Sequence, residues 1–310
     1  MRKDEIMTEA MKERLKAIYQ ELTISDEFMF FTVMQNEELC KRMLETILDI
    51  KIEKIEYLEA EKQIKELFEG RGVRLDVYLK DNKRTVYNLE MQVKKQDNIP
   101  RRMRYYQGIM DVNLLKESQA YEGLNDSFVI FLCRFDLFGK NKAKYTFKNM
   151  CKEVAGLELG DGATKVVVNS KAVVKNLDTK DLDVSQELVS LLKYIERGEV
   201  TDEFTTILDK EVCKVKNDSV RRDQFMFYEA RMRAHDLEIE REAEKRGEIR
   251  GKIEGKIEGK IEGEEVTASL YVKLIEDGRY EDAKKAETDS EFRQQLFEEY
   301  RLLKNQTVES

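Results

Sequence analysis

Three polar residues on two neighbouring segments carry the strongest chemical signal in the sequence. Asp76 lies in Gly-Val-Arg-Leu-Asp-Val-Tyr-Leu-Lys, and Glu90 and Gln92 lie in Thr-Val-Tyr-Asn-Leu-Glu-Met-Gln-Val. Both segments alternate with period two, as β-strands do when successive side chains face opposite sides of a sheet. Asp76 falls on the polar face of the first strand, and Glu90 and Gln92 share the polar face of the second. Two carboxylates and an amide are therefore expected to converge on one surface.

The turn between the two strands decides whether the carboxylates meet. Residues directly opposite each other in a hairpin have Cβ atoms only about 5 Å apart. Asp76 stands opposite Glu90 when paired residue numbers sum to 166, which centres the turn on Lys83 and predicts a three-residue loop with a bulge. A two-residue turn at 82–83 would instead offset the two acids by one position.

A close pair of acids calls for a cation. Two unpaired carboxylates repel each other, and removing them from water is costly unless a positive charge neutralises them. Mg²⁺ favours oxygen ligands and commonly takes one or two carboxylates plus substrate phosphate, so Asp76 and Glu90 are candidate ligands for Mg²⁺, with Mn²⁺ as a substitute. The alternative is an exposed polar face of a two-sided sheet. The continuous apolar run Ser127–Phe135 indicates that this sheet is covered and favours the metal site.

The same residues resemble the PD-(D/E)XK nuclease superfamily. Asp76 matches its first acid, Glu90 its second, and Gln92 the position that is lysine in the general pattern. The segments Gly-Val-Arg-Leu-Asp-Val, Asn-Leu-Glu-Met-Gln and Arg-Tyr-Tyr are similar to the Rpn-like branch of transposases and recombination-promoting nucleases. The resemblance covers roughly the first half of the chain. It implies an α/β fold with a restriction-endonuclease-like core, in which helices flank a mixed central sheet.

The resemblance also implies an activity, the Mg²⁺-dependent hydrolysis of DNA phosphodiester bonds. Asp76, Glu90 and Gln92 are then the catalytic residues, and the Met91 backbone carbonyl joins the two acids as a metal ligand. Gln92 can orient the attacking water, but it lacks the charge of a lysine. Lys94, the next residue on that face, is an alternative source of that charge.

Glu38 is a candidate for an additional metal ligand. It lies on a helix expected from Asn36 to Ile50, which resembles the first helix of the nuclease core, where the superfamily often carries another acid. A solvated glutamate on the helix face explains it equally well.

A local basic cluster adjoins the proposed site and is a candidate DNA contact. Arginines near a helix N-terminus suit phosphate groups, because the free N–H groups and the helix dipole also favour anions. Tyr105 is placed to stack on bases, whereas Tyr106 falls on the apolar stripe of the helix and is expected in the core. An ordinary solvated helix face is the alternative. The candidate DNA-binding residues are Lys94, Lys95, Arg101, Arg102, Arg104 and Tyr105.

The composition of the chain narrows the classes of function and of metal site that remain. The net charge of −8 gives no global basic field, so any nucleic-acid contact must be local. The four cysteines show no paired spacing, which argues against disulfides and zinc and fits a reducing cytoplasm. The single histidine, His235, argues against histidine metal clusters and Ser-His-Asp chemistry. No apolar run approaches the length of a membrane span, so no membrane association is expected.

The elements that must position the site follow from periodicity. A strand at 51–60, a polar connection at 61–70 and the hairpin precede a helix from Asn98 to about Glu117. The strand at 127–135 then completes a βαβ unit. A further strand pair is expected at 144–147 and 165–169, and the sequence beyond is helical. We expect four parts: a nuclease core at 1–175, a helical subdomain at 176–246, a repeat at 247–265 and a helical segment at 266–310, with helices at 266–275 and 290–303.

The repeat reads Gly-Lys-Ile-Glu from Gly251 to Gly263. A helix is expected, although each glycine costs roughly 1 kcal/mol relative to alanine. One interpretation is a spacer or a self-association segment that joins two chains as a homodimer through a seam of isoleucines. The other is a slippage tract without a specific role. The tail, the acidic total charge and the glutamine at position 92 also leave open a second function, a catalytically inactive nuclease fold that binds DNA or protein.

Overall fold

A six-stranded mixed sheet forms the centre of the protein. The computed structural model describes residues 8–64, 73–115, 120–175 and 183–302. The strand order is β1-β2-β3-β4-β6-β5, in which β3, β4 and β6 are parallel and the other neighbours are antiparallel. The fold is therefore the mixed α/β fold expected from the sequence. The strands are β1 (Ile55–Ile64), β2 (Val73–Asp81), β3 (Val86–Gln92), β4 (Ser127–Cys133), β5 (Lys144–Phe147) and β6 (Ala163–Asn169).

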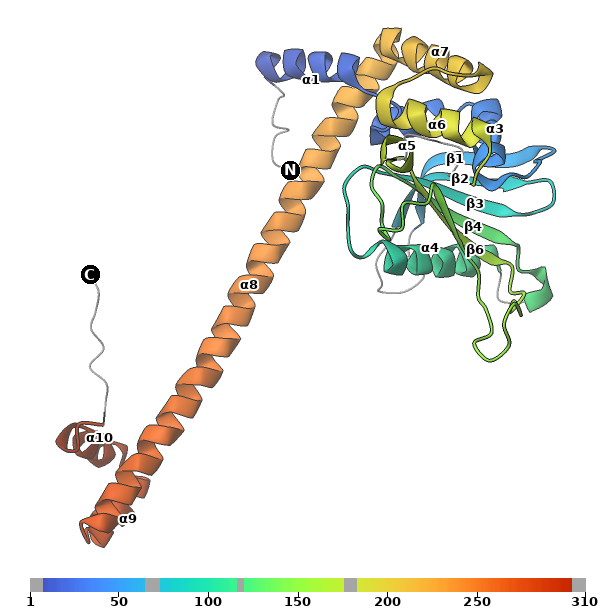
Figure 1. The fold of residues 1–310 in the computed structure, drawn as a ribbon. Coiled ribbons are helices and arrows are strands. Elements are labelled where there is room, and N and C mark those ends of the chain that lie inside the picture. The colour runs from blue at the N-terminus through green and yellow to red at the C-terminus, as the bar shows by residue number, and fades with distance from the viewer. Residues whose placement is uncertain (1–7, 65–72, 116–119, 176–182, 303–310) are drawn as a thin grey trace. The chain divides into compact units, whose positions relative to one another are not determined.

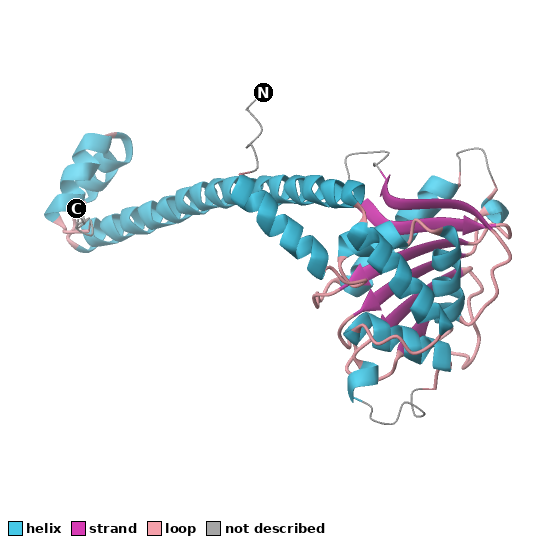
Figure 2. Cartoon of the chain, turned by 90° about the horizontal axis from the view of Figure 1, so that it is seen from above, coloured by secondary structure: helices cyan, strands magenta, loops and turns pink. Residues whose placement is uncertain are grey.

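Helices cover both faces of this sheet (Figures 1 and 2). On one face, α4 packs its buried side chains Met103, Tyr106 and Met110 against Val129 and Phe131 of β4. On the other face lie α2 and α3, with α6 packed on α3 and α7 on α2. The sheet is thus covered where the acids lie, as the apolar β4 indicated. The remaining bounds in this part of the chain are α1 (Glu9–Glu21), α2 (Glu27–Val33), α3 (Glu37–Leu48), α4 (Ile99–Leu114), η1 (Tyr121–Gly123), α5 (Ala172–Lys175), α6 (Gln186–Arg197) and α7 (Glu203–Asn217).

The turn between β2 and β3 is built by one carboxylate. Asp81 Oδ1 accepts hydrogen bonds from the backbone N–H groups of Lys83 and Thr85, at 2.9 and 2.8 Å, and Asp81 Oδ2 accepts one from the Tyr87 hydroxyl at 2.9 Å. Arg84 takes a left-handed conformation, with φ of 69°, as in a three-residue loop with a bulge. Beyond the loop Val77 pairs with Leu89, which confirms the predicted register.

Two boundaries differ from those expected. β1 runs from Ile55 to Ile64, four residues later than the expected strand at 51–60, so residues 61–64 are strand and not a polar connection. Antiparallel pairing with β2 holds this end of the strand, out to the pair formed by Ile64 and Val73. The rest of that expected connection, 65–70, lies outside the described residues. No separate helix begins at Val266, since α8 runs without a break from Ser219 to Glu276.

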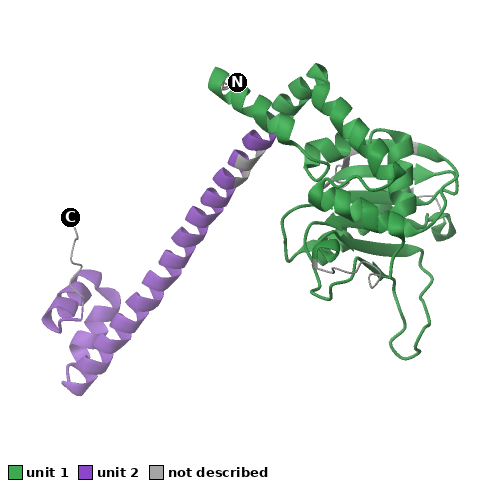
Figure 3. Ribbon diagram, turned by 45° about the horizontal axis from the view of Figure 1, so that its top comes forward, with its two compact units in different colours: residues 1–230 green, residues 231–310 purple. Residues whose placement is uncertain are grey.

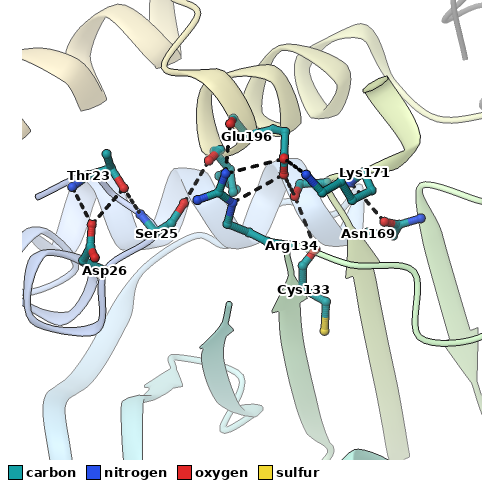
Figure 4. Close-up of polar contacts among 10 residues, drawn as sticks. Thr23, Ser25, Asp26, Cys133, Arg134, Asn169, Lys171 and Glu196 are labelled. Carbon is teal, nitrogen blue, oxygen red and sulfur yellow. Dashed lines mark hydrogen bonds and ion pairs between the residues drawn. The ribbon is translucent and has the colours of Figure 1, made fainter. Parts of the chain in front are cut away.

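A buried glutamate fastens α6 to the ends of two parallel strands (Figure 4). The Glu196 side chain is 4% exposed, and its carboxylate accepts hydrogen bonds from Lys171, from the Ser170 hydroxyl at 2.7 Å and from Arg134 Nε at 3.4 Å. Burial raises the pKa of Glu196, but the hydrogen bonds from Lys171, Ser170 and Arg134 outweigh it and hold this pKa below its ordinary value of 4.5. The ionised form of Glu196 is therefore the one that stabilises the fold.

Glu196→Gln is expected to lower the free energy of unfolding by about 1–3 kcal/mol at pH 7, because it leaves Arg134 and Lys171 without their shared carboxylate. A carboxyl whose pKa is lowered on folding contributes stability above its unfolded pKa and loses it as the pH falls through the folded pKa. The difference between the free energies of unfolding of Glu196→Gln and the parent, measured in urea, should therefore shrink as the pH falls below about 4.5. Glu199→Gln, which removes an exposed ion pair with Arg197, is the control and should change stability by less than about 0.5 kcal/mol. An equal loss in both variants would contradict the assignment.

The chain divides into two compact units, residues 1–230 and 231–310 (Figure 3). The first contains the sheet together with α6 and α7. The second contains most of α8 (Ser219–Glu276) with α9 (Tyr280–Thr288) and α10 (Ser290–Glu299), and it has its own core around Leu270, Leu274 and Phe297. The four-part division expected from the sequence stays a prediction. None of the described helices has the length and hydropathy needed to span a bilayer.

Candidate active site

Asp76 and Glu90 form a buried pair of acids on adjacent strands. The two residues are 7% and 2% exposed. The Asp76 N–H donates to Glu90 Oε1 at 3.0 Å, and the Met91 N–H donates to Asp76 Oδ2 at 3.0 Å. Each carboxylate thus reaches the backbone beside the other acid, as the register of the hairpin requires. The hairpin brings together the two side chains on which the sequence interpretation depended.

The pair is poised to accept positive charge. Burial raises the pKa of Glu90 well above its ordinary value of 4.5, and the neighbouring charge of Asp76 raises it further. Hydrogen bonding from the backbone of Asp76 and the charge of Arg102 act in the opposite direction without overcoming these two effects. Without a cation, Glu90 therefore holds its proton at pH values where an exposed glutamate is ionised.

Arg102 lies beside the acid pair and is less exposed than Arg101 and Arg104 on the same helix. Its side chain is 25% exposed, and its guanidinium lies 3.8 Å from Glu90 Oε2. It donates to Gln92 Oε1 at 2.9 Å and to the Tyr106 hydroxyl at 3.1 Å, and it lies over the Phe131 ring, 5.3 Å from its centre. Arg102 was predicted as one of the basic residues that contact DNA. Its four-residue spacing from Tyr106, which puts both residues on the same side of α4, is the signal in the sequence for this position.

Gln92 is held between Arg102 and the backbone. Its Oε1 accepts from Arg102, and its Nε2 donates to the Met91 carbonyl at 2.8 Å. The amide thus links the cation of α4 to the carbonyl expected to serve as a metal ligand. Met91 itself is buried at the end of β3, at 6% exposure.

The other candidate residues are distributed unevenly. Lys94, Lys95, Arg101 and Arg104 are exposed around the start of α4, and Tyr105 is 41% exposed. Tyr106 is buried, as expected for a core residue. Glu38 is exposed on α3, and α3 lies on the face of the sheet opposite to α4, so the structure does not bring it to the acid pair.

The residues at this site fit a hydrated Mg²⁺ ion better than a fully protein-bound metal. Among the residues that the structure describes, no three His, Cys, Asp or Glu side chains gather to hold a metal. Mg²⁺ usually keeps several waters and needs only one or two carboxylates. Asn88, two residues before Glu90 on the same face, is fully buried, and its side-chain amide lies close enough to Glu90 to lower the pKa of that carboxyl. Two carboxylates with an amide beside them form the oxygen-rich donor set that Mg²⁺ prefers.

The chain thus combines a mixed sheet covered by helices with two buried acids from one hairpin. The family model for PD-(D/E)XK nuclease family transposases matches residues 28–245, well over half of the chain, and the chain belongs to this family. The match includes the sheet, the acid pair and α4, and it ends before Gly251, where the Gly-Lys-Ile-Glu repeat begins. Neither the curated proteins nor the solved structures include one that matches the chain.

Proposed function

We propose that the chain is a Mg²⁺-dependent DNA endonuclease of a transposase or recombination-promoting type, which hydrolyses phosphodiester bonds. The observation that carries this proposal is the buried pair formed by Asp76 and Glu90. Burying two acids side by side destabilises a folded protein unless a cation binds between them. A metal ion bound for nuclease activity would be such a cation.

In this proposal Asp76, Glu90 and the Met91 carbonyl hold Mg²⁺. The ion, when bound, lowers the pKa of a water molecule and stabilises charge on the scissile phosphate. The protein's own contribution is to keep both acids free of bulk water and to fix Gln92 between Arg102 and the backbone. Arg102 supplies the positive charge that glutamine lacks at position 92, from the helix and not from the strand.

DNA is the proposed partner, through the exposed residues beside the site. Lys94, Lys95, Arg101 and Arg104 surround the first turn of α4, where phosphate contacts are favoured. Tyr105 offers an exposed ring for base stacking. Two chains joined through the tail would carry one acid pair for each strand of a duplex.

A second candidate function is a catalytically inactive module that binds DNA or protein. One observation favours it, because the acids already have partners within the chain: backbone N–H groups at 3.0 Å and the Arg102 guanidinium at 3.8 Å. In this case Arg102 would take the place of a metal ion.

Nicking of supercoiled plasmid separates the two functions. The parent protein is expected to nick DNA with Mg²⁺ or Mn²⁺ and to stop when the metal is chelated, and Asp76→Ala and Glu90→Ala should both be inactive. Nicking that survives both substitutions would show that the site is wrong or the preparation contaminated. DNA binding by the parent without any nicking would favour the inactive module.

A further inference from the structure

A row of isoleucines along α8 is uncovered in the described chain. Ile249, Ile253, Ile257 and Ile261 are between 50% and 59% exposed. Further along the same helix, Val266, Leu270 and Leu274 repeat this four-residue spacing, and there Leu270 and Leu274 are fully buried under α9 and α10. One helix thus carries two ridges of the same spacing, of which only the second has a partner within the chain.

Charged residues flank the isoleucine ridge asymmetrically. Successive residues of a helix are about 100° apart, so in each Gly-Lys-Ile-Glu unit the lysine lies on one side of the isoleucine and the glutamate on the other. Because the unit repeats every four residues, one flank of Ile253, Ile257 and Ile261 carries lysines and the other carries glutamates, while the glycines lie on the back. At Ile249 the order of charges is reversed, with Glu248 on the first flank and Arg250 on the second. The lysine flank is Lys252, Lys256 and Lys260, and the glutamate flank is Glu254, Glu258 and Glu262.

These flanking charges have few partners within their own helix. Lysine meets lysine and glutamate meets glutamate at four-residue spacing, which is unfavourable. Among the described residues, the ion pairs of the repeat are Glu248–Lys252 at 2.6 Å and Lys260–Glu264 at 3.8 Å, one at each end. The middle of the repeat therefore presents an apolar ridge between two unpaired rows of opposite charge.

A second copy of the same helix covers the apolar ridge and pairs both charged flanks with opposite charges in only one relative direction. When two identical helices face each other in parallel, their two-fold axis runs along the helices and brings the lysine flank of one against the glutamate flank of the other. In the antiparallel arrangement the axis crosses the helices, and lysine meets lysine while glutamate meets glutamate. We propose that the ridge Ile249–Ile261 is a self-association surface on which a second copy of this chain packs in parallel.

The ridge also determines the kind of contact. Its four-residue spacing exceeds the 3.6 residues of a helical turn, so the ridge drifts around the axis, and two such ridges cross instead of forming a long left-handed coiled coil. The contact is closest at Ile253 and Ile257, in the middle of the repeat. Gly255, on the back of the helix, has open space around it and takes no part.

The mass of the full-length protein tests this proposal by sedimentation equilibrium. The parent is expected to be a dimer, and Ile253→Asp with Ile257→Asp should raise the dimer dissociation constant at least tenfold while circular dichroism shows an unchanged helix content. Gly255→Ala is the matched control and should remain dimeric. A monomeric parent would overturn the proposal, as would a dimer that Gly255→Ala breaks and the isoleucine variants do not.

Charge variants test the pairing of the flanks. A protein with Lys252, Lys256 and Lys260 changed to glutamate has two acidic flanks, and one with Glu254, Glu258 and Glu262 changed to lysine has two basic flanks. Each is expected to be monomeric alone, and the two should pair when mixed. Failure of the mixture to pair while the parent dimerises would overturn the role of the flanks.

Salt and spin labels test the direction. Dimerisation of the parent should weaken with added salt if opposite charges meet, and strengthen if like charges meet. Spin labels at Glu242→Cys, in a protein with Cys151→Ser and Cys213→Ser, should lie closer to each other in a parallel pair than labels at the same position in an antiparallel one. A salt-strengthened dimer with widely separated labels would overturn the parallel arrangement. Neither readout involves catalysis, so the result is independent of the nuclease proposal.

Discussion

Replacing Asp76 with asparagine or Glu90 with glutamine is expected to reduce plasmid nicking by at least about three orders of magnitude. A metal ion contributes several kcal/mol to such a reaction, and each 1.4 kcal/mol is about tenfold in rate. The same substitutions should make the metal-free protein more stable, because they remove the repulsion within a buried pair. Loss of activity together with a gain in stability is expected where a functional site is kept at a cost to the stability of the fold.

The pH dependence of that stability gain has a definite sign. A carboxyl whose pKa is raised on folding contributes stability below its unfolded pKa and loses it as the pH rises through the raised value. Because the pKa of Glu90 is raised by burial and by Asp76, the parent loses stability as the pH rises above about 4.5 toward that raised value, whereas Glu90→Gln does not. Thermal unfolding in chelator should show a larger gain for Glu90→Gln at pH 8 than at pH 4.5.

Mg²⁺ supplies the complementary measurement. It should raise the melting temperature of the parent but not of either acid variant, since only the parent keeps both ligands. Glu38→Gln is the control for a remote acid and should retain both nicking and the response to Mg²⁺. If Glu38→Gln abolished nicking, or if Glu90→Gln were destabilised equally at both pH values, the acid pair would not be the site.

Replacing Arg102 with methionine is expected to reduce nicking by about ten- to a hundredfold and to move the pH profile to higher pH. The charge of Arg102 lowers the pKa of Glu90, so removing it lets that pKa rise further, and the pair becomes fully ionised only at higher pH. Methionine preserves most of the packing against Phe131 and Tyr106, so the fold should survive. The pH–rate profile separates this positioning role from a purely structural one, which would lower the rate equally at every pH.

Arg101→Ala and Arg104→Ala are the matched controls for Arg102. Both residues are exposed on the same helix, so their loss should weaken DNA binding and reduce its salt dependence without moving the pH profile. Arg102→Lys should restore the profile in part, because it returns the charge but not the fork that reaches both Gln92 and Tyr106. If the pH–rate profile of Arg102→Met were the same as that of the parent, the proposed effect of Arg102 on Glu90 would be wrong.

The fold could be predicted from local rules where those rules act alone. Alternation fixed the faces of β2 and β3, and the count of residues in the turn fixed their register. The βαβ unit followed from the helix at α4 and the apolar β4. β1 was placed four residues too early because residues 61–63 are polar, and pairing with β2 overrides that composition.

The two acids of the candidate site could be predicted from the sequence, but the position of Arg102 beside them could not. Asp76 and Glu90 are separated by a short turn, so their meeting depends on one hairpin. Arg102 reaches Glu90 only because α4 returns across the sheet after β3, a tertiary arrangement that spacing along the strand does not contain. For the same reason the sequence could not decide between Glu38 as a metal ligand and Glu38 as a solvated side chain, since α3 lies on the face of the sheet opposite to α4.

The loop that Asp81 organises has a consequence for how this protein can change. Adding or deleting one residue between Asn82 and Arg84 would slip the pairing by one position and carry Glu90 to the far side of the sheet from Asp76. Substitutions that leave the loop at three residues have no such effect on the pairing. Variants with altered loop length should therefore lose the site even when every acid is retained. Evolution of this turn is therefore constrained more by the number of its residues than by the identity of their side chains.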